Sequence, residues 1–148
     1  MRLLLPRVTQ AHVSVESQVV GSIGAGLVIL VGVGHDDTAA VAVGLAHKAV
    51  DLRIFRDDEG KTNRSLIDVG GAVLAISQFT LFGDTRKGRR PSFIDAAPPE
   101  LGNELYERFC ATVEERGVKV ARGIFGAEMQ VELVNDGPMT IWLDSAAG

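Results

Sequence analysis

Three polar side chains stand at the end of an apolar run that otherwise has the composition of a buried strand. The run begins at Ala72, directly after a diglycine, and reaches Ser77, Gln78 and Thr80. Its length and its unbroken apolar character predict a strand that is buried on both faces. Buried polar groups need partners, which can be protein, water or ligand. The end of this strand is therefore where we expect a binding or catalytic site.

A cationic loop follows this strand. Four positive side chains occur within five residues, namely Arg86, Lys87, Arg89 and Arg90. Clustered charge indicates a nucleic-acid contact only as a motif-level hypothesis, and a solvated loop is the simpler interpretation. The net charge of −4 argues against a general nucleic-acid coating protein. A polar strand end beside a cationic loop predicts a pocket next to a phosphate-bearing substrate.

The stretch has hydroxyl groups but no base to activate them. Ser77 and Thr80 are the only hydroxyls within residues 72–82, and no histidine or lysine of that run offers itself as a base, so Thr80 is more simply structural than nucleophilic. The three histidines form no metal-ligand pair, and no metal or other cofactor is expected. Cys110 lies in an expected helix and is most simply a small buried hydrophobe. An enzyme with this set of side chains would work by positioning its substrate, by main-chain hydrogen-bond donors and with help from a group of the substrate itself.

Length and composition indicate one soluble domain. The chain has 148 residues, which is most economically a single domain over 1–148. A single cysteine excludes an intramolecular disulfide. No signal peptide is recognisable, and no apolar run approaches the roughly 20 residues of a membrane span. We expect a cytoplasmic protein without a membrane partner.

The hydrophobic pattern predicts a mixed α/β domain with a mainly antiparallel sheet. Strands are expected at residues 2–9, 12–16, 19–23, 24–34, 53–55, 72–82, 118–121, 128–135 and 139–143. Helices are expected from Thr38 to about Leu52, and from Pro98 to Gly117. Residues 135–138 read as a turn between the last two strands.

Two segments together resemble the signature motifs of the D-aminoacyl-tRNA deacylases. They are residues 77–81, Ser-Gln-Phe-Thr-Leu, and residues 135–140, Asn-Asp-Gly-Pro-Met-Thr. The resemblance extends over nearly the whole chain, in family order and spacing. Met139 departs from the family, which usually has valine there. A longer and more flexible side chain beside the pocket leaves the fine substrate preference open.

The resemblance implies a reaction, an assembly and a fold. The reaction is hydrolysis of the ester between a D-amino acid, or glycine, and the 3′-terminal adenosine of tRNA, which is chiral proofreading. The assembly is a homodimer with active sites at the interface and no metal. The fold is a double-sheet, barrel-like β core with two helices packed on one side.

The second motif implies a selectivity gate. In the family, Gly137 and Pro138 form a cis dipeptide whose carbonyls enter the partner subunit's pocket, with Met139 and Thr140 completing the motif. Such a rigid backbone would accept the substrate's ammonium group and collide with an L side chain, so selectivity would come from steric exclusion. From the residues alone, an ordinary turn is the simpler interpretation.

The first motif implies the wall that receives the substrate. Ser77, Gln78, Phe79 and Thr80 would form it, with N–H groups near Phe79 and Thr80 stabilising the oxyanion. The ribose 2′-hydroxyl would assist attack by water. Phe125 would lie near the terminal adenine, although a core aromatic is an equal alternative. The cationic loop would contact acceptor-stem phosphates.

Two alternatives remain open at this point. One is a non-catalytic dimeric tRNA- or RNA-binding protein that uses the cationic loop, which fits the absence of a catalytic triad. The other is a small-molecule hydrolase with Thr80 as nucleophile and no need for RNA.

Overall fold

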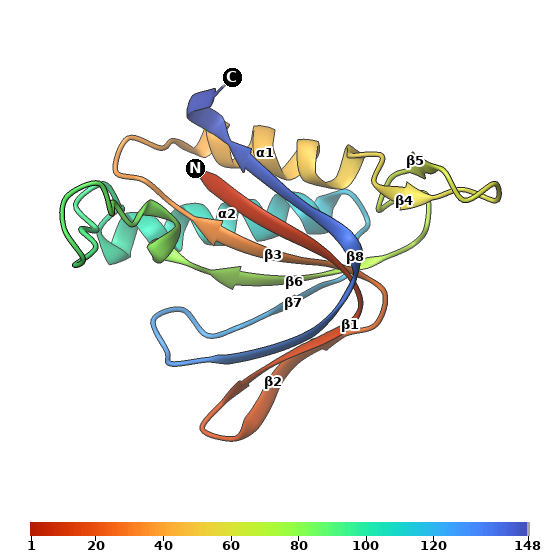
Figure 1. The fold of residues 1–148 in the computed structure, drawn as a ribbon, viewed down its shortest axis with the longest axis horizontal. Coiled ribbons are helices and arrows are strands. Elements are labelled where there is room, and N and C mark those ends of the chain that lie inside the picture. Colours follow the sequence, from red (N-terminus) through yellow and green to blue (C-terminus); the bar gives the residue numbers. More distant parts are fainter. Residues whose placement is uncertain (148) are drawn as a thin grey trace.

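One long strand, β1 (Arg2–Val15), organises the sheet by pairing along both of its edges (Figure 1). The computed structural model describes residues 1–147. On one edge β1 pairs antiparallel with β3 (Gly26–Gly32) and then with β2 (Gln18–Ile23). On the other edge it pairs antiparallel with β8 (Gln130–Asp144). The two strands expected at 2–9 and 12–16 are therefore one continuous strand.

The remaining strands of this sheet run parallel to β3. β6 (Ala72–Ser77) pairs with β3, and β7 (Val120–Arg122) pairs with β6. The strand expected at 72–82 is too long, because the chain turns into a 3₁₀ helix over Phe79–Phe82. Parallel neighbours need a long crossover connection. The crossovers contain α1 (Ala39–Asp51) with the small hairpin of β4 (Phe55–Arg56) and β5 (Thr62–Arg64), and α2 (Pro99–Glu115). The β1 pairs are antiparallel as expected, but the sequence pattern did not reveal the parallel pairs.

The sheet curls into a nearly closed barrel because β2 approaches β7. The contact requires a glycine, since a Cβ on Gly21 would lie 2.7 Å from the main-chain oxygen of Arg122. The barrel interior is filled by one apolar cluster, which includes Val13, Val28 and Leu74. The barrel-like core expected from the resemblance is confirmed.

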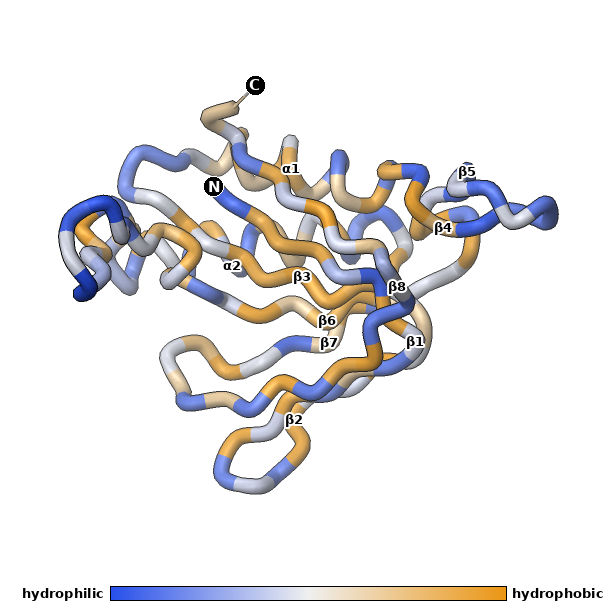
Figure 2. The backbone as a smooth tube through the Cα atoms, in the orientation of Figure 1, coloured by the Kyte–Doolittle hydropathy of each residue, from blue (hydrophilic) through white to orange (hydrophobic). Residues whose placement is uncertain are grey.

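Both helices pack against the outer face of the barrel, on the same side (Figure 1). Thr38 caps α1 by accepting a hydrogen bond from the N–H of Val41, and Pro99 occupies the first turn of α2. Alternate residues of β3 and β6 face the helices and the barrel interior. This explains the unbroken apolar runs along these strands (Figure 2). No helix in the described part of the chain is long and apolar enough to cross a membrane.

The expected turn at residues 135–138 is wrong. β8 continues through this segment as one strand, and its pairing with β1 shifts between Pro6 and Val8. Those two residues pair with Thr140 and Asn135, so the β8 segment between them is the longer one and bulges. The chain does not reverse because β1 provides a pairing partner on both sides of the bulge.

Candidate active site

The main pocket lies beyond the carboxyl end of β6 and has a volume of about 550 Å³. Its wall comes from five segments: the end of β6 with the 3₁₀ turn η1 (Phe79–Phe82), Val33 after β3, the loop 93–97, the first turn of α2 and the β7–β8 connection. The carboxyl ends of parallel strands are a common place for ligand sites in mixed sheets. The unforeseen parallel pairing of β3 with β6 therefore places the end of β6 and Val33 in the wall of the same site.

The structure brings several of the expected site residues together in this pocket. Ser77, Gln78, Phe79 and Phe125 all line it, whereas Thr80 does not. Phe79 is 54% exposed and makes an edge-on contact with Phe93, with ring centroids 5.2 Å apart. The predicted wall is thus a polar strand end beside an aromatic rim.

The main chain of η1 presents two N–H groups for which the described residues provide no acceptor. The Gln78 N–H donates to the main-chain oxygen of Val31 over 2.7 Å, and the Leu81 N–H donates to that of Gln78 over 3.2 Å. Between them, the N–H groups of Phe79 and Thr80 have no recorded acceptor among residues 1–147. Polar main-chain groups normally find partners, so these two are available to a ligand.

Glycine at position 32 allows η1 to lie against the sheet. A Cβ on Gly32 would come within 2.9 Å of Leu81 Cβ and 3.0 Å of the main-chain oxygen of Gln78. The Gln78 side-chain amide donates to Thr80 Oγ1 within the same turn. This bond orients the Thr80 hydroxyl without supplying a base.

No ionisable side chain belongs to the pocket wall within the described residues. Nearby, burial raises the pKa of the Cys110 thiol to about 12, so it stays protonated, as expected of a buried hydrophobe. Burial also raises the pKa of Tyr106, whose hydroxyl donates to the main-chain oxygen of Ala75 over 2.8 Å. The wall therefore offers hydrogen-bond donors and apolar surface, but no general acid or base.

Phe125 has two environments. Its ring lines the pocket and also lies 6.4 Å, centroid to centroid, from Tyr106. It packs over the backbone of α2 where Gly102 leaves room. One face is thus fixed by the core, and the pocket can use the other.

The second motif is not part of this pocket. Gly137 and Pro138 are exposed and joined by a cis peptide bond, as the resemblance implies. Their neighbour Thr140 pairs with Pro6 of β1, and β1 meets the beginning of β3 there, whereas Ser77 pairs with Val31 near the end of β3. Met139 packs beside the apolar core under the helices. The two motifs therefore lie at opposite ends of the same sheet.

Arg7 is a functional candidate that the sequence analysis missed. It is only 3% exposed, and its Nε donates to the main-chain oxygen of Asp136 over 3.0 Å. Asn135 folds across the same segment and donates to the main-chain oxygen of Arg7 over 2.8 Å. Its Oδ1 leaves no room for a Cβ at Gly137. Together these contacts hold the exposed dipeptide rigidly. The one signal in the sequence for this anchoring role of Arg7 is its position as a charged residue within an apolar strand.

The cationic loop is exposed beyond the pocket, at the end that carries the hydrophilic segment after β6 (Figure 2). One of its cations is already neutralised: Arg86 forms a two-point ion pair with Asp84, and this hydrogen bond lowers the pKa of Asp84 to about 2. No ion pair within residues 1–147 involves Lys87, Arg89 or Arg90. Three of the four expected cations are therefore free for a phosphate-bearing ligand.

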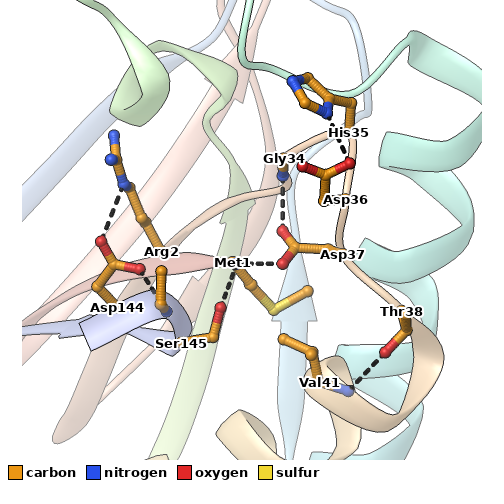
Figure 3. Close-up of polar contacts among 11 residues, drawn as sticks. Met1, Arg2, Gly34, His35, Asp36, Asp37, Thr38, Val41, Asp144 and Ser145 are labelled. Atoms are coloured by element: carbon orange, nitrogen blue, oxygen red, sulfur yellow. Dashed lines mark hydrogen bonds and ion pairs between the residues drawn. The ribbon is translucent and has the colours of Figure 1, made fainter. Parts of the chain in front are cut away.

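The loop between β3 and α1, drawn in Figure 3, contacts residues 93–97 of the pocket wall. Gly34 forms a β-bridge with Ala96, and the His35 N–H donates to the main-chain oxygen of Asp95 over 3.2 Å. The His35 ring contacts the Asp36 carboxylate at 3.0 Å, and this hydrogen bond raises the pKa of His35 above 6.5. Among the described residues, no group of three or more histidine, cysteine or acidic side chains is placed to hold a metal ion.

Comparisons with known proteins identify the family. The family model described as D-Tyr-tRNA(Tyr) deacylase matches residues 4–144. A D-aminoacyl-tRNA deacylase of Thermomicrobium roseum is 59% identical over 99% of this chain and 95% of its own length, and that of Roseiflexus castenholzii is 58% identical over 99% and 93%. A solved c-Myc DNA Unwinding Element Binding Protein superposes with a TM-score of 0.92 at 36% identity, covering 98% of this chain and 99% of that one. The chain therefore belongs to the D-Tyr-tRNA(Tyr) deacylase family, whose curated members are hydrolases of the aminoacyl-tRNA ester bond.

Proposed function

We propose that this chain hydrolyses the ester between a D-amino acid, or glycine, and the 3′-terminal adenosine of tRNA, as a chiral proofreading enzyme of the cytoplasm. The observation that carries the proposal is a pocket whose described wall has no ionisable side chain, bordered by the turn η1 with its two unused main-chain N–H groups. Such a wall can bind an oxyanion but cannot itself accept or donate the protons of hydrolysis.

The chemistry follows from that inventory. Water attacks the ester carbonyl, and the developing oxyanion accepts hydrogen bonds from the N–H groups of Phe79 and Thr80. Donors of this kind each contribute about 2.7–4 kcal/mol to transition-state stabilisation. The neighbouring ribose 2′-hydroxyl assists the proton transfers, because the described pocket wall offers no base. The bond between the acyl carbon and the ribose 3′-oxygen then breaks. The products are the free amino acid and tRNA with its 3′-hydroxyl restored.

Selectivity requires a second copy of the chain. Gly137 and Pro138 are exposed and held by Arg7 and Asn135, but they lie at the end of the sheet opposite to the pocket. In a homodimer, this dipeptide of one protomer would enter the pocket of its partner, accept the substrate's ammonium group and exclude an L side chain.

The outer edge of β8 supports such a dimer. β8 pairs only with β1 in the described part of the chain, and it carries Val134 and Trp142, each 48% exposed. Exposed apolar residues beside an open strand edge are typical of a protein interface.

The tRNA would be held at two places. Phe125 offers one ring face to the terminal adenine, since bases stack readily on aromatic side chains. Lys87, Arg89 and Arg90 are free to contact acceptor-stem phosphates, which would position the RNA without reading its sequence.

The test is hydrolysis of D-tyrosyl-tRNA and L-tyrosyl-tRNA by the purified protein, with a chelator present throughout. Rapid loss of the D ester alone supports the reaction and its chiral selectivity. Equal loss of both esters would remove the proofreading role, and a requirement for added metal would overturn the mechanism.

The three free cations of the loop favour one competing function, a non-catalytic RNA-binding dimer. That function predicts salt-sensitive tRNA binding without turnover, so the same assay separates the two. A hydrolase that uses Thr80 as nucleophile is less well supported, because the Thr80 hydroxyl accepts a hydrogen bond from the Gln78 amide and has no base beside it in the described part of the chain.

A further inference from the structure

The side chain of Arg2 connects the end of η1 to the C-terminal part of β8. Its Nη1 donates to the main-chain oxygen of Leu81 over 2.9 Å, and its Nε donates to Asp144 Oδ2 over 3.2 Å. The guanidinium carbon also lies 4.4 Å from the centroid of the Phe82 ring. A planar guanidinium can make these contacts at once, which a lysine ammonium cannot do.

The Phe82 ring in turn packs on the loop that follows β3. A Cβ on Gly34 would lie 2.9 Å from two carbons of that ring, so the ring rests directly on the Gly34 backbone. The last two residues of η1 are therefore held from two directions, by Arg2 and by the loop.

The residue before Arg2 is anchored by polar contacts (Figure 3). The amino group of the preceding residue, Met1, forms an ion pair with Asp37 and donates to Ser145 Oγ over 2.6 Å. The other oxygen of Asp37 accepts the Gly34 N–H over 2.7 Å. Met1 and Arg2 thus connect Asp144 and Ser145 to the loop after β3 and to η1.

We propose that Arg2 is a positioning residue for the deacylase reaction, acting through η1. The turn has only four residues, with Phe79 at one end and Phe82 at the other. A contact that fixes Leu81 and Phe82 therefore also fixes the direction of the Phe79 and Thr80 N–H groups. This inference rests on the proposed role of those groups, because Arg2 does not line the pocket itself.

The experiment measures the single-turnover rate on D-tyrosyl-tRNA at saturating enzyme, together with the dissociation constant for tRNA. We expect Arg2→Ala to slow the rate about tenfold or more, since small misplacements of catalytic donors have effects of this size. The dissociation constant should change less than twofold. Arg2→Lys can make only part of the contact, so its single-turnover rate should lie between those of Arg2→Ala and the parent. It also keeps the test usable if Arg2→Ala does not fold.

Arg116→Ala is the matched control. Its side chain has a similar exposure, 30% against 33% for Arg2, and it forms an ion pair with Asp51 between the two helices, away from the pocket. Its single-turnover rate should stay within twofold of the parent. Arg2 variants that lose only thermal stability, with the rate unchanged, would overturn the positioning role. Weaker tRNA binding at an unchanged rate would overturn it too, by showing Arg2 to be an RNA contact.

Thr80→Pro separates this inference from the proposed function, because it removes the Thr80 N–H directly. If Thr80→Pro loses most of its rate while the Arg2 variants keep the full rate, the role of Arg2 is refuted and the proposed oxyanion site is not. Full rate in Thr80→Pro would refute the proposed oxyanion site and, with it, the basis of the inference.

Discussion

The buried Arg7 side chain donates from Nε to the main-chain oxygen of Asp136 over 3.0 Å and from Nη1 to that of Ile54 over 2.6 Å. Each buried acceptor that loses its donor costs about 1–3 kcal/mol. We therefore expect Arg7→Ala to lower the free energy of unfolding by about 2–4 kcal/mol in urea titrations. Arg56→Ala is the control: Arg56 binds the carboxylate of the same Asp136 but is half exposed, so its loss should cost less than about 1 kcal/mol. Equal losses of unfolding free energy in the two variants would contradict the role of the buried Arg7 hydrogen bonds.

Pro138→Ala should weaken discrimination against L-aminoacyl-tRNA. In the proposed dimer the Gly137–Pro138 backbone would collide with an L side chain, and replacing the proline ring with alanine would make that backbone less rigid. We expect the rate on L-tyrosyl-tRNA to rise about tenfold relative to that on D-tyrosyl-tRNA, which serves as the internal control. An unchanged ratio of the two rates would remove the gate role from this dipeptide.

Thr80→Ala should keep substantial activity, within about fivefold of the parent, because the proposed donor is the Thr80 N–H. Thr80→Pro removes that donor and should lower the rate constant by about 10²–10³. Both are measured by single-turnover hydrolysis of D-tyrosyl-tRNA. If Thr80→Ala lost several orders of magnitude, the hydroxyl would be the nucleophile and substrate-assisted hydrolysis would be wrong.

Arg89→Ala should weaken tRNA binding more than Arg86→Ala. Arg86 is already paired with Asp84, whereas Arg89 has no ion pair among the described residues. A lost phosphate contact reduces the slope of log K against log salt concentration by about 1. We expect that reduction for Arg89→Ala and a smaller one for Arg86→Ala in binding titrations at several salt concentrations. Identical slopes would show that the Asp84 pair opens on binding.

His35 should make stability depend on pH. Its pKa in the folded protein is raised above 6.5, chiefly by the hydrogen bond to Asp36 and also by Asp95. The stabilisation is therefore complete below about pH 6.5 and is lost as the pH rises through the folded-state pKa. The difference in unfolding free energy between the parent and His35→Gln should be larger at about pH 5.5 than at about pH 8. A His35 pKa at or below 6.5 in an NMR titration would contradict the expectation.

Local sequence chemistry determined much of the fold. The unbroken apolar run before Ser77, the Thr38 cap and the proline at the start of α2 each specify an element through contacts with near neighbours. A pocket beside Ser77 and Gln78 was predictable for a similar reason, because polar groups at the end of a buried strand need partners. Phe79 was expected only from the resemblance, and Thr80, expected on the same polar argument, does not line the pocket.

Tertiary structure decided the rest, because the deciding contacts join residues far apart in the chain. The parallel pairing of β3 with β6 and the bulge in β8 depend on which strands become neighbours, and hydrophobic periodicity does not encode neighbours. The anchoring roles of Arg2 and Arg7 arise from main-chain oxygens 79 and 129 positions away. A charged side chain in a strand can be solvated or buried, and only the packed structure provides the buried partners that Arg7 needs.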